Sequence, residues 1–227
     1  TVSYEILKQL KLLDRRHALV YFRFLQHDEI AQAVLHWTSL WTTPPYYYPE
    51  LRWGQSPYYD YVHPKDVQVL SALSESFSDV RKDLTRYFDL HPDLIAEGAE
   101  SERAGWFQFW FHGGGAWNET SCRNIAPTLC RRFRTLLPTV THPIVVEHQE
   151  SLELFGLPPG GIVNLHSDDT NARVTTLMCI FGCTGAWIKV AGQRRDLNEA
   201  NLVSWNAGYD HWTGNDGDVI RWVISLA

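Results

Sequence analysis

The part of the chain that follows Trp106 is divided into short apolar segments by glycine, proline and asparagine. Segments of about four to eight residues bounded in this way are typical of strands, because helices need longer periodic stretches. Turn sequences such as Asn206-Ala207-Gly208 separate them. Residues 101–227 are therefore expected to form a β-sandwich or jelly roll. The expected strands are 106–112, 144–147, 161–165, 173–181, 186–190, 201–205 and 219–226.

Residues 1–100 predict a helical and extended layer over this β core. Apolar residues in 1–35 are spaced as in a helix, whereas prolines and tyrosines in 41–64 favour an extended path. Asp66 to Phe88 predicts one long helix that Asp66 caps and whose apolar side chains recur at steps of three and four. We expect one domain over 1–227, mainly β with N-terminal helices.

Composition excludes several classes of function. The net charge is -6 and the basic residues are scattered, with only a short cluster at 131–134, so we expect no nucleic-acid partner. No apolar stretch approaches the roughly 20 residues of a membrane helix, so we expect no membrane partner. The chain starts at Thr1 without a basic and apolar leader, so a signal or initiator Met is expected to be removed or to lie outside this sequence. We expect a soluble protein; a cytoplasmic location is favoured over the secretory pathway, and the oligomeric state stays open.

Four cysteines form two local pairs, Cys122 with Cys130 and Cys179 with Cys183. Neither pair has the spacing of a zinc ribbon, and four cysteines in 227 residues are too few for a disulfide scaffold. Buried free thiols are the first expectation. A disulfide between Cys122 and Cys130 remains the alternative.

His166-Ser167-Asp168 follows a predicted strand and begins a polar loop. Residues two apart on an extended backbone point to the same side, so His166 and Asp168 can face one ion. His211, in the turn before the last predicted strand, supplies a third ligand. Two imidazoles and a carboxylate on one face of an octahedral ion leave open positions, as non-haem Fe(II) oxygenases require. A solvated loop is the alternative for a triplet this short.

Arg221 interrupts the apolar run of the last predicted strand. An unpaired buried guanidinium is costly, so an arginine at such a position indicates an anionic partner. The distal carboxylate of 2-oxoglutarate suits the parallel N–H donors of arginine. The alternative is an outward-facing side chain on an exposed sheet.

His112-Gly113-Gly114-Gly115 is similar to the oxyanion loop of lipase-like hydrolases. That chemistry also needs a Gly-x-Ser-x-Gly turn, which the sequence lacks. We therefore reject a hydrolase.

Several motifs occur together in a specific order. Tyr47-Tyr48-Pro49-Glu50-Leu51 precedes the long helix, and Gly105-Trp106-Phe107-Gln108-Phe109 follows it. Pro159-Gly160 then precedes His166-x4-Asn171-x-Arg173, and His211 is followed by Arg221. With these motifs the chain resembles the aspartyl/asparaginyl β-hydroxylase family of 2-oxoglutarate-dependent oxygenases, from about Tyr46 to the C-terminus.

The resemblance implies a double-stranded β-helix (cupin-like) core with Fe(II), 2-oxoglutarate and O2 as cofactor and co-substrates. It implies iron on His166 and His211, to which Asp168 adds a carboxylate, and Arg221 on 2-oxoglutarate. We assign Thr175 to the co-substrate as well. Three further residues, from the motif and from the vicinity of His211, are assigned to the substrate: Arg173, Asn171 and Trp212.

The chain also departs from the family pattern. Animal members have glycine in place of Asp168, and an arginine and a histidine where Thr175 and Leu177 align. A serine that helps to hold 2-oxoglutarate aligns with Phe155. The first expected function is hydroxylation of an unactivated sp3 carbon, the β-carbon of an Asp- or Asn-like residue in a peptide or protein. The alternative is hydroxylation or desaturation of a free amino acid or small metabolite. A non-catalytic binding module is disfavoured because the ligand set is complete.

Overall fold

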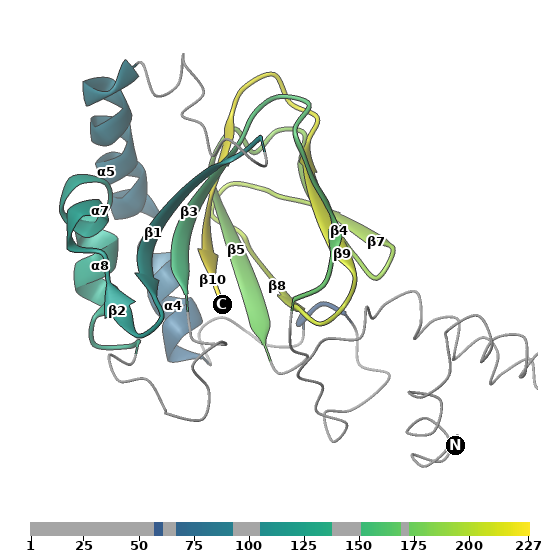
Figure 1. Ribbon diagram of the computed structural model, residues 1–227, viewed down its shortest axis with the longest axis horizontal. Helices are drawn as coiled ribbons and strands as arrows, with labels where there is room; N and C mark the ends of the chain where they lie inside the picture. Colours follow the sequence, from purple (N-terminus) through teal and green to yellow (C-terminus); the bar gives the residue numbers. More distant parts are fainter. Residues whose placement is uncertain (1–56, 61–66, 93–104, 138–150, 169–172) are drawn as a thin grey trace, which may run out of the picture.

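The computed structural model describes residues 57–60, 67–92, 105–137, 151–168 and 173–227 (Figure 1). Within these ranges two β-sheets face each other, and helices cover the outer side of the larger sheet. The expected helix in 1–35 and the expected strand 144–147 lie outside the described residues, as do Asp66 and Asn171.

The two sheets have the topology of a double-stranded β-helix. The six-stranded sheet has the order β2-β1-β3-β10-β5-β8 and the four-stranded sheet the order β4-β9-β6-β7, with antiparallel pairing between the neighbours. From β3 to β10 the chain passes back and forth between the sheets, which confirms the predicted fold. The strands are β1 (Phe107–Gly113), β2 (Ala116–Trp117), β3 (Leu152–Leu157), β4 (Ile162–His166), β5 (Val174–Phe181), β6 (Ala186–Val190), β7 (Gln193–Asp196), β8 (Leu202–Asn206), β9 (His211–Asn215) and β10 (Arg221–Leu226).

Strands β2, β3, β7 and β9 were not expected from the sequence. β3 and β9 each contain a glycine, and neither glycine forms a turn. Each lies where the indole of a tryptophan packs closely against the strand. A Cβ on Gly214 would lie 2.4 Å from the ring of Trp187, and one on Gly156 would lie 2.5 Å from the ring of Trp222. The expectation that His211 lies in a turn was therefore wrong, because His211 is the first residue of β9.

Helices α4 (Gln68–Glu75) and α5 (Phe77–Leu90) replace the single helix expected from Asp66 to Phe88. The break is at Ser76, a buried residue whose hydroxyl donates to the carbonyl of Ala72, a bond that commonly bends helices. Together with α7 (Glu119–Asn124) and α8 (Pro127–Phe133), these helices cover the outer face of the six-stranded sheet (Figure 1). None of the described helices is long and apolar enough to cross a membrane.

Strand β10 shows how the core is divided into two layers. Trp222, Ile224 and Leu226 pack with the helices in one hydrophobic cluster, and Val223 belongs to a second cluster between the sheets. Because side chains alternate along a strand, Arg221 and Ser225 share the inner face with Val223. The alternative of an outward-facing Arg221 is excluded, since only 2% of this residue is exposed.

The glycines after His112 form a tight hairpin between β1 and β2. Gly113 pairs with Ala116, so Gly114 and Gly115 are the two turn residues, and both have positive φ. A two-residue type I′ turn requires positive φ at both positions, which glycine adopts without strain. The glycine run thus has a structural explanation, in agreement with the rejection of a hydrolase.

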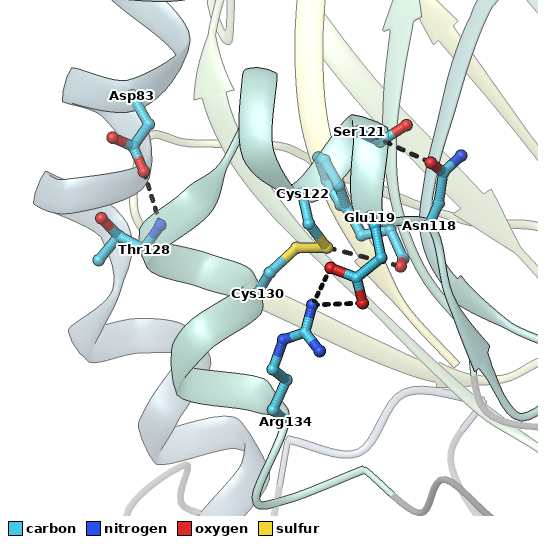
Figure 2. The surroundings of a disulfide bond; sticks show 9 residues. Asp83, Asn118, Glu119, Ser121, Cys122, Thr128, Cys130 and Arg134 are labelled. Carbon is cyan, nitrogen blue, oxygen red and sulfur yellow. Dashed lines mark hydrogen bonds and ion pairs between the residues drawn. A yellow bond between two sulfur atoms is a disulfide. The ribbon is translucent and has the colours of Figure 1, made fainter.

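Both cysteine pairs form disulfides, Cys122–Cys130 and Cys179–Cys183. The expectation of free thiols was wrong, and the alternative for Cys122 and Cys130 was right. Figure 2 shows that the first bridge joins α7 to α8, beside an ion pair in which Arg134 donates to both oxygens of Glu119. The signal that sequence reasoning lacked was the helical hairpin that brings the cysteines together.

Replacing Cys122 and Cys130 together by serine should lower the free energy of unfolding by about 2–3 kcal/mol, because the closed loop restricts the unfolded chain. Urea denaturation under oxidising conditions measures the loss. Glu119→Gln is the matched control, since it breaks only an exposed ion pair and should cost less than about 1 kcal/mol. Equal stability of the double variant and the wild type would contradict the role of the bridge.

Candidate metal centre and cofactor cavity

His166, Asp168 and His211 converge at the open side of the cavity between the sheets. One ligand atom from each lies within 4.8 Å of the others, and the two imidazole centroids are 4.2 Å apart. In the described part of the chain this is the one group of three or more His, Cys, Asp or Glu so placed. The three residues predicted from sequence as a metal site are thus brought together.

A bulge in β4 aims His166 into the cavity. Val163 pairs with Thr213 and His166 pairs with His211, so three residues on β4 advance against two on β9. An extra residue reverses the alternation of side chains, so His166 shares the cavity side with Val163 while 59% of Leu165 is exposed. The backbone N–H of Asp168 donates to Ala207 at 2.9 Å, which ties the loop after β4 to the turn before β9.

Both histidines are held in the tautomer that metal binding needs. Nδ1 of His166 lies 2.7 Å from the carbonyl oxygen of Asn164, and Nδ1 of His211 lies 2.8 Å from that of Tyr209. A carbonyl only accepts, so each Nδ1 carries the proton and each Nε2 keeps its lone pair for an ion. Burial, with a contribution from His166, lowers the pKa of His211 to about 4, so this ring is neutral at physiological pH.

The cavity behind the three ligands measures about 240 Å³ and reaches inward between the sheets. Trp205 forms part of the wall and its ring lies tilted against that of His211, with ring centroids 5.5 Å apart. Trp212, expected as a substrate contact, does not line this cavity, because neighbouring residues of β9 point to opposite faces. The Trp212 ring lies instead beneath the ammonium of Lys189, at 4.9 Å. The other apolar residues that line the cavity are Trp106, Phe155, Leu157, Val163, Leu177, Ile188, Val223 and Ala227.

Arg221 lies in the cavity without a carboxylate partner among the described residues. One guanidinium nitrogen donates to the hydroxyl of Thr213, and the carbonyl of Gly214 lies 3.5 Å from that nitrogen. Nε is buried and has no hydrogen-bond partner in the described part of the chain. Burial lowers the pKa of Arg221 to about 10, so the group keeps its charge at neutral pH. A buried cation with an unsatisfied donor fits an anionic ligand.

Two other predicted site residues line the same cavity. Oγ1 of Thr175 is buried and, like Nε of Arg221, has no partner among the described residues. A guanidinium nitrogen of Arg173 lies 3.6 Å from a carboxylate oxygen of Asp168, and both side chains are about a quarter exposed. Thr175 is therefore inside the cavity, whereas Arg173 lies at its edge beside Asp168.

The family model for aspartyl/asparaginyl β-hydroxylases matches residues 74–227 of this chain. The chain belongs to this family. The resemblance noted in the sequence is thus confirmed, and the match includes all the residues that form the candidate metal centre. No curated protein sequence matches the chain.

Solved structures similar to this family member include two cupin proteins and a predicted oxalate decarboxylase. The cupin domain of an XRE-family transcriptional regulator from Enterobacter cloacae is 18% identical, with a TM-score of 0.31, and covers 34% of this chain and 78% of its own. A cupin superfamily protein from Desulfitobacterium hafniense is 18% identical, with a TM-score of 0.30 and coverage of 34% and 65%. A predicted oxalate decarboxylase from Thermotoga maritima is 17% identical, with a TM-score of 0.30 and coverage of 34% and 63%.

In this aspartyl/asparaginyl β-hydroxylase family member, sequence reasoning missed five polar residues that line the cavity: Gln108, Ser151, Glu153, Thr213 and Ser225. Glu153 on β3 is buried, and Nε2 of Gln108 on β1 donates to its carboxylate at 2.7 Å. The signal was present in the sequence, because Glu153 interrupts an apolar segment just as Arg221 does. It was overlooked because β3 itself was not recognised.

Proposed function

We propose that this protein is an Fe(II)- and 2-oxoglutarate-dependent dioxygenase that hydroxylates an unactivated sp3 carbon. The observation that carries the proposal is the pair of imidazoles with Nδ1 donated to backbone carbonyls and Nε2 free, beside Asp168. Two nitrogens and one carboxylate oxygen form the facial donor set that suits Fe(II) and leaves positions for other ligands. Membership of a hydroxylase family supports the same chemistry.

The metal and its co-substrates would occupy different parts of the cavity. When bound, Fe(II) with 2-oxoglutarate and O2 supplies the replacement of an aliphatic C–H by C–OH, with release of succinate and CO2. Arg221 would bind the distal carboxylate of 2-oxoglutarate through the Nε–H, which has no partner among the described residues, and Thr175 would donate its hydroxyl. The apolar walls, including Trp205 and Phe155, would keep water away from the reacting carbon.

The substrate is proposed to be an amino acid unit. An Asp- or Asn-like residue in a peptide or protein is the first candidate, with Arg173 at the cavity edge to pair with a carboxylate. A free amino acid or small metabolite is the second candidate. The buried Glu153 favours this second class, because a carboxylate in the cavity suits a cationic group better than an acidic side chain.

The two disulfides support an oxidising compartment over the cytoplasmic location that the sequence favoured. Disulfides persist in secretory and extracellular environments and are rare where thiols are kept reduced. Alkylation of cysteines in freshly lysed cells, followed by mass spectrometry, measures the oxidised fraction directly.

Purified protein with Fe(II), ascorbate and O2 should convert 2-oxoglutarate to succinate, and the rate should rise with a substrate from a panel of peptides and free amino acids. A chelator should abolish succinate formation, and added Fe(II), but not Zn(II), should restore it. Binding of 2-oxoglutarate is measured in parallel by calorimetry on the metal-loaded protein. Absence of both 2-oxoglutarate binding and succinate formation would refute the proposal.

A further inference from the structure

The cavity contains a buried carboxylate that the proposed metal and co-substrate sites do not use. Only 6% of Glu153 is exposed, and the residue lines the same cavity as Arg221 and His211. It lies opposite Ser225 on β10, so its side chain comes from the inner face of the larger sheet. The amide of Gln108 donates to one carboxylate oxygen at 2.7 Å and fixes the orientation of the group.

Glu153 has polar neighbours but no cationic partner at salt-bridge distance among the described residues. Burial raises the pKa of Glu153, while hydrogen bonds from Gln108 and Ser151 and the charge of Arg173 act in the opposite direction. A buried carboxylate is stable in its ionised form when a cation pairs with it. A positively charged ligand would therefore complete this part of the cavity.

The position of Glu153 separates it from the end that is proposed to bind 2-oxoglutarate. On the paired strands β3 and β10, Arg221 lies opposite Leu157 and Ser225 lies opposite Glu153. Four residues along a strand span about 13 Å. The inner face of the sheet thus presents a cation at one end and a carboxylate at the other, which gives an anionic co-substrate and a cationic group separate binding places.

We infer that Glu153 binds the protonated amine of the primary substrate. This selects the second candidate of the proposed function, a free amino acid, over the first, an internal Asp or Asn residue of a peptide. Arg173, whose charge acts on Glu153 and which lies at the cavity edge, is placed to take the carboxylate of the same molecule. The two opposite charges fit a zwitterion. This inference rests on the proposed function, because it assigns the Arg221 end of the cavity to 2-oxoglutarate.

Binding of amine probes tests the inference directly. The full-length protein is loaded with Zn(II) and 2-oxoglutarate and screened by ligand-observed NMR against the twenty L-amino acids, their N-acetyl derivatives and N-acetylated peptides with internal Asp or Asn. Amino acids with a free amine should bind, and acetylation should weaken binding about 10- to 100-fold, because it removes a charged hydrogen-bond donor. Peptides with a free amino-terminal residue are included because they distinguish a site for a free amino acid from a site for the N-terminus of a peptide.

Substitutions then attribute the preference to one side chain. Glu153→Gln, which keeps the size and the contact with Gln108, should bring the affinities for amines and N-acetyl derivatives within a few-fold of each other. Glu153→Asp should retain part of the preference. Glu199→Gln is the matched control, since it removes an exposed carboxylate paired with Arg81 and should keep the wild-type preference.

Three results would overturn the inference: N-acetyl derivatives that bind as well as free amines, an amine preference that survives in Glu153→Gln, or no amine binding to protein that has bound 2-oxoglutarate. The wild-type comparison decides the question even if Glu153→Gln does not fold. Failure to bind 2-oxoglutarate in any metal-loaded form counts against the proposed function instead. If amines still bind in a Glu153-dependent manner in that case, the amine site stands and the assignment of the Arg221 end to 2-oxoglutarate is lost.

Discussion

Replacing His211 by alanine should abolish Fe(II) binding at micromolar metal and reduce succinate formation by at least about 100-fold. Loss of a residue that orients a metal ligand lowers metal affinity or activity roughly 10- to 100-fold. Loss of the ligand itself should therefore lower them further. Among the described residues His166 and His211 are the only histidines that line the cavity, so no other imidazole is placed to replace His211. Iron content after anaerobic reconstitution and the initial rate of succinate formation are the two measurements.

His91→Ala is the matched control for this variant, because it removes an exposed imidazole at the end of α5, outside the cavity. It should keep wild-type iron content and rate. Asp168→Ala extends the test to the carboxylate that animal family members lack. Full iron content and wild-type turnover in Asp168→Ala would show that two histidines suffice here and would remove Asp168 from the ligand set.

The sequence predicted most of the fold because alternation and turn chemistry dominate in a two-sheet core. Strands such as β5, β6 and β8 were found within one or two residues, since their apolar runs end at clear breaks. β3 and β9 were missed, and each contains a glycine, Gly156 or Gly214, a residue that is depleted in strands. The reason for each glycine is an indole from another strand, Trp222 or Trp187, and a local pattern does not contain that information.

The candidate site shows the same division between local and non-local signals. His166 and Asp168 lie two residues apart, and Arg221 is a charged residue within an apolar run. Sequence patterns therefore suggest all three as site residues. Which face each side chain takes depends on packing: the β4 bulge turns His166 inward, and strand alternation turns Trp212 outward. Glu153 belongs with Arg221 chemically, yet only the pairing of β3 with β10 puts both in one cavity.

Replacing Arg221 by methionine should raise the KM for 2-oxoglutarate by about 30- to 5000-fold. Removing one partner of a buried charge pair costs about 2–5 kcal/mol, and the proposed partner here is the distal carboxylate of the co-substrate. Arg221→Lys should lose part of the affinity, because an ammonium keeps the charge but not the parallel N–H donors. Succinate formation as a function of 2-oxoglutarate concentration measures KM, and calorimetry measures binding in the absence of O2.

For the stability of the protein without co-substrate, we expect no loss in Arg221→Met. This result would separate an effect on 2-oxoglutarate binding from an effect on folding. Arg221 is a buried cation whose Nε has no partner among the described residues, so methionine should leave the thermal stability of the ligand-free protein unchanged or raise it. 2-Oxoglutarate should raise the melting temperature of the wild type, and this increase should be absent in the variant. Arg194→Met, at an exposed arginine of β7, is the control and should keep that increase. A ligand-free Arg221→Met protein that unfolds at much lower temperature would mean that Arg221 serves the core, because a binding residue has no reason to stabilise an empty cavity.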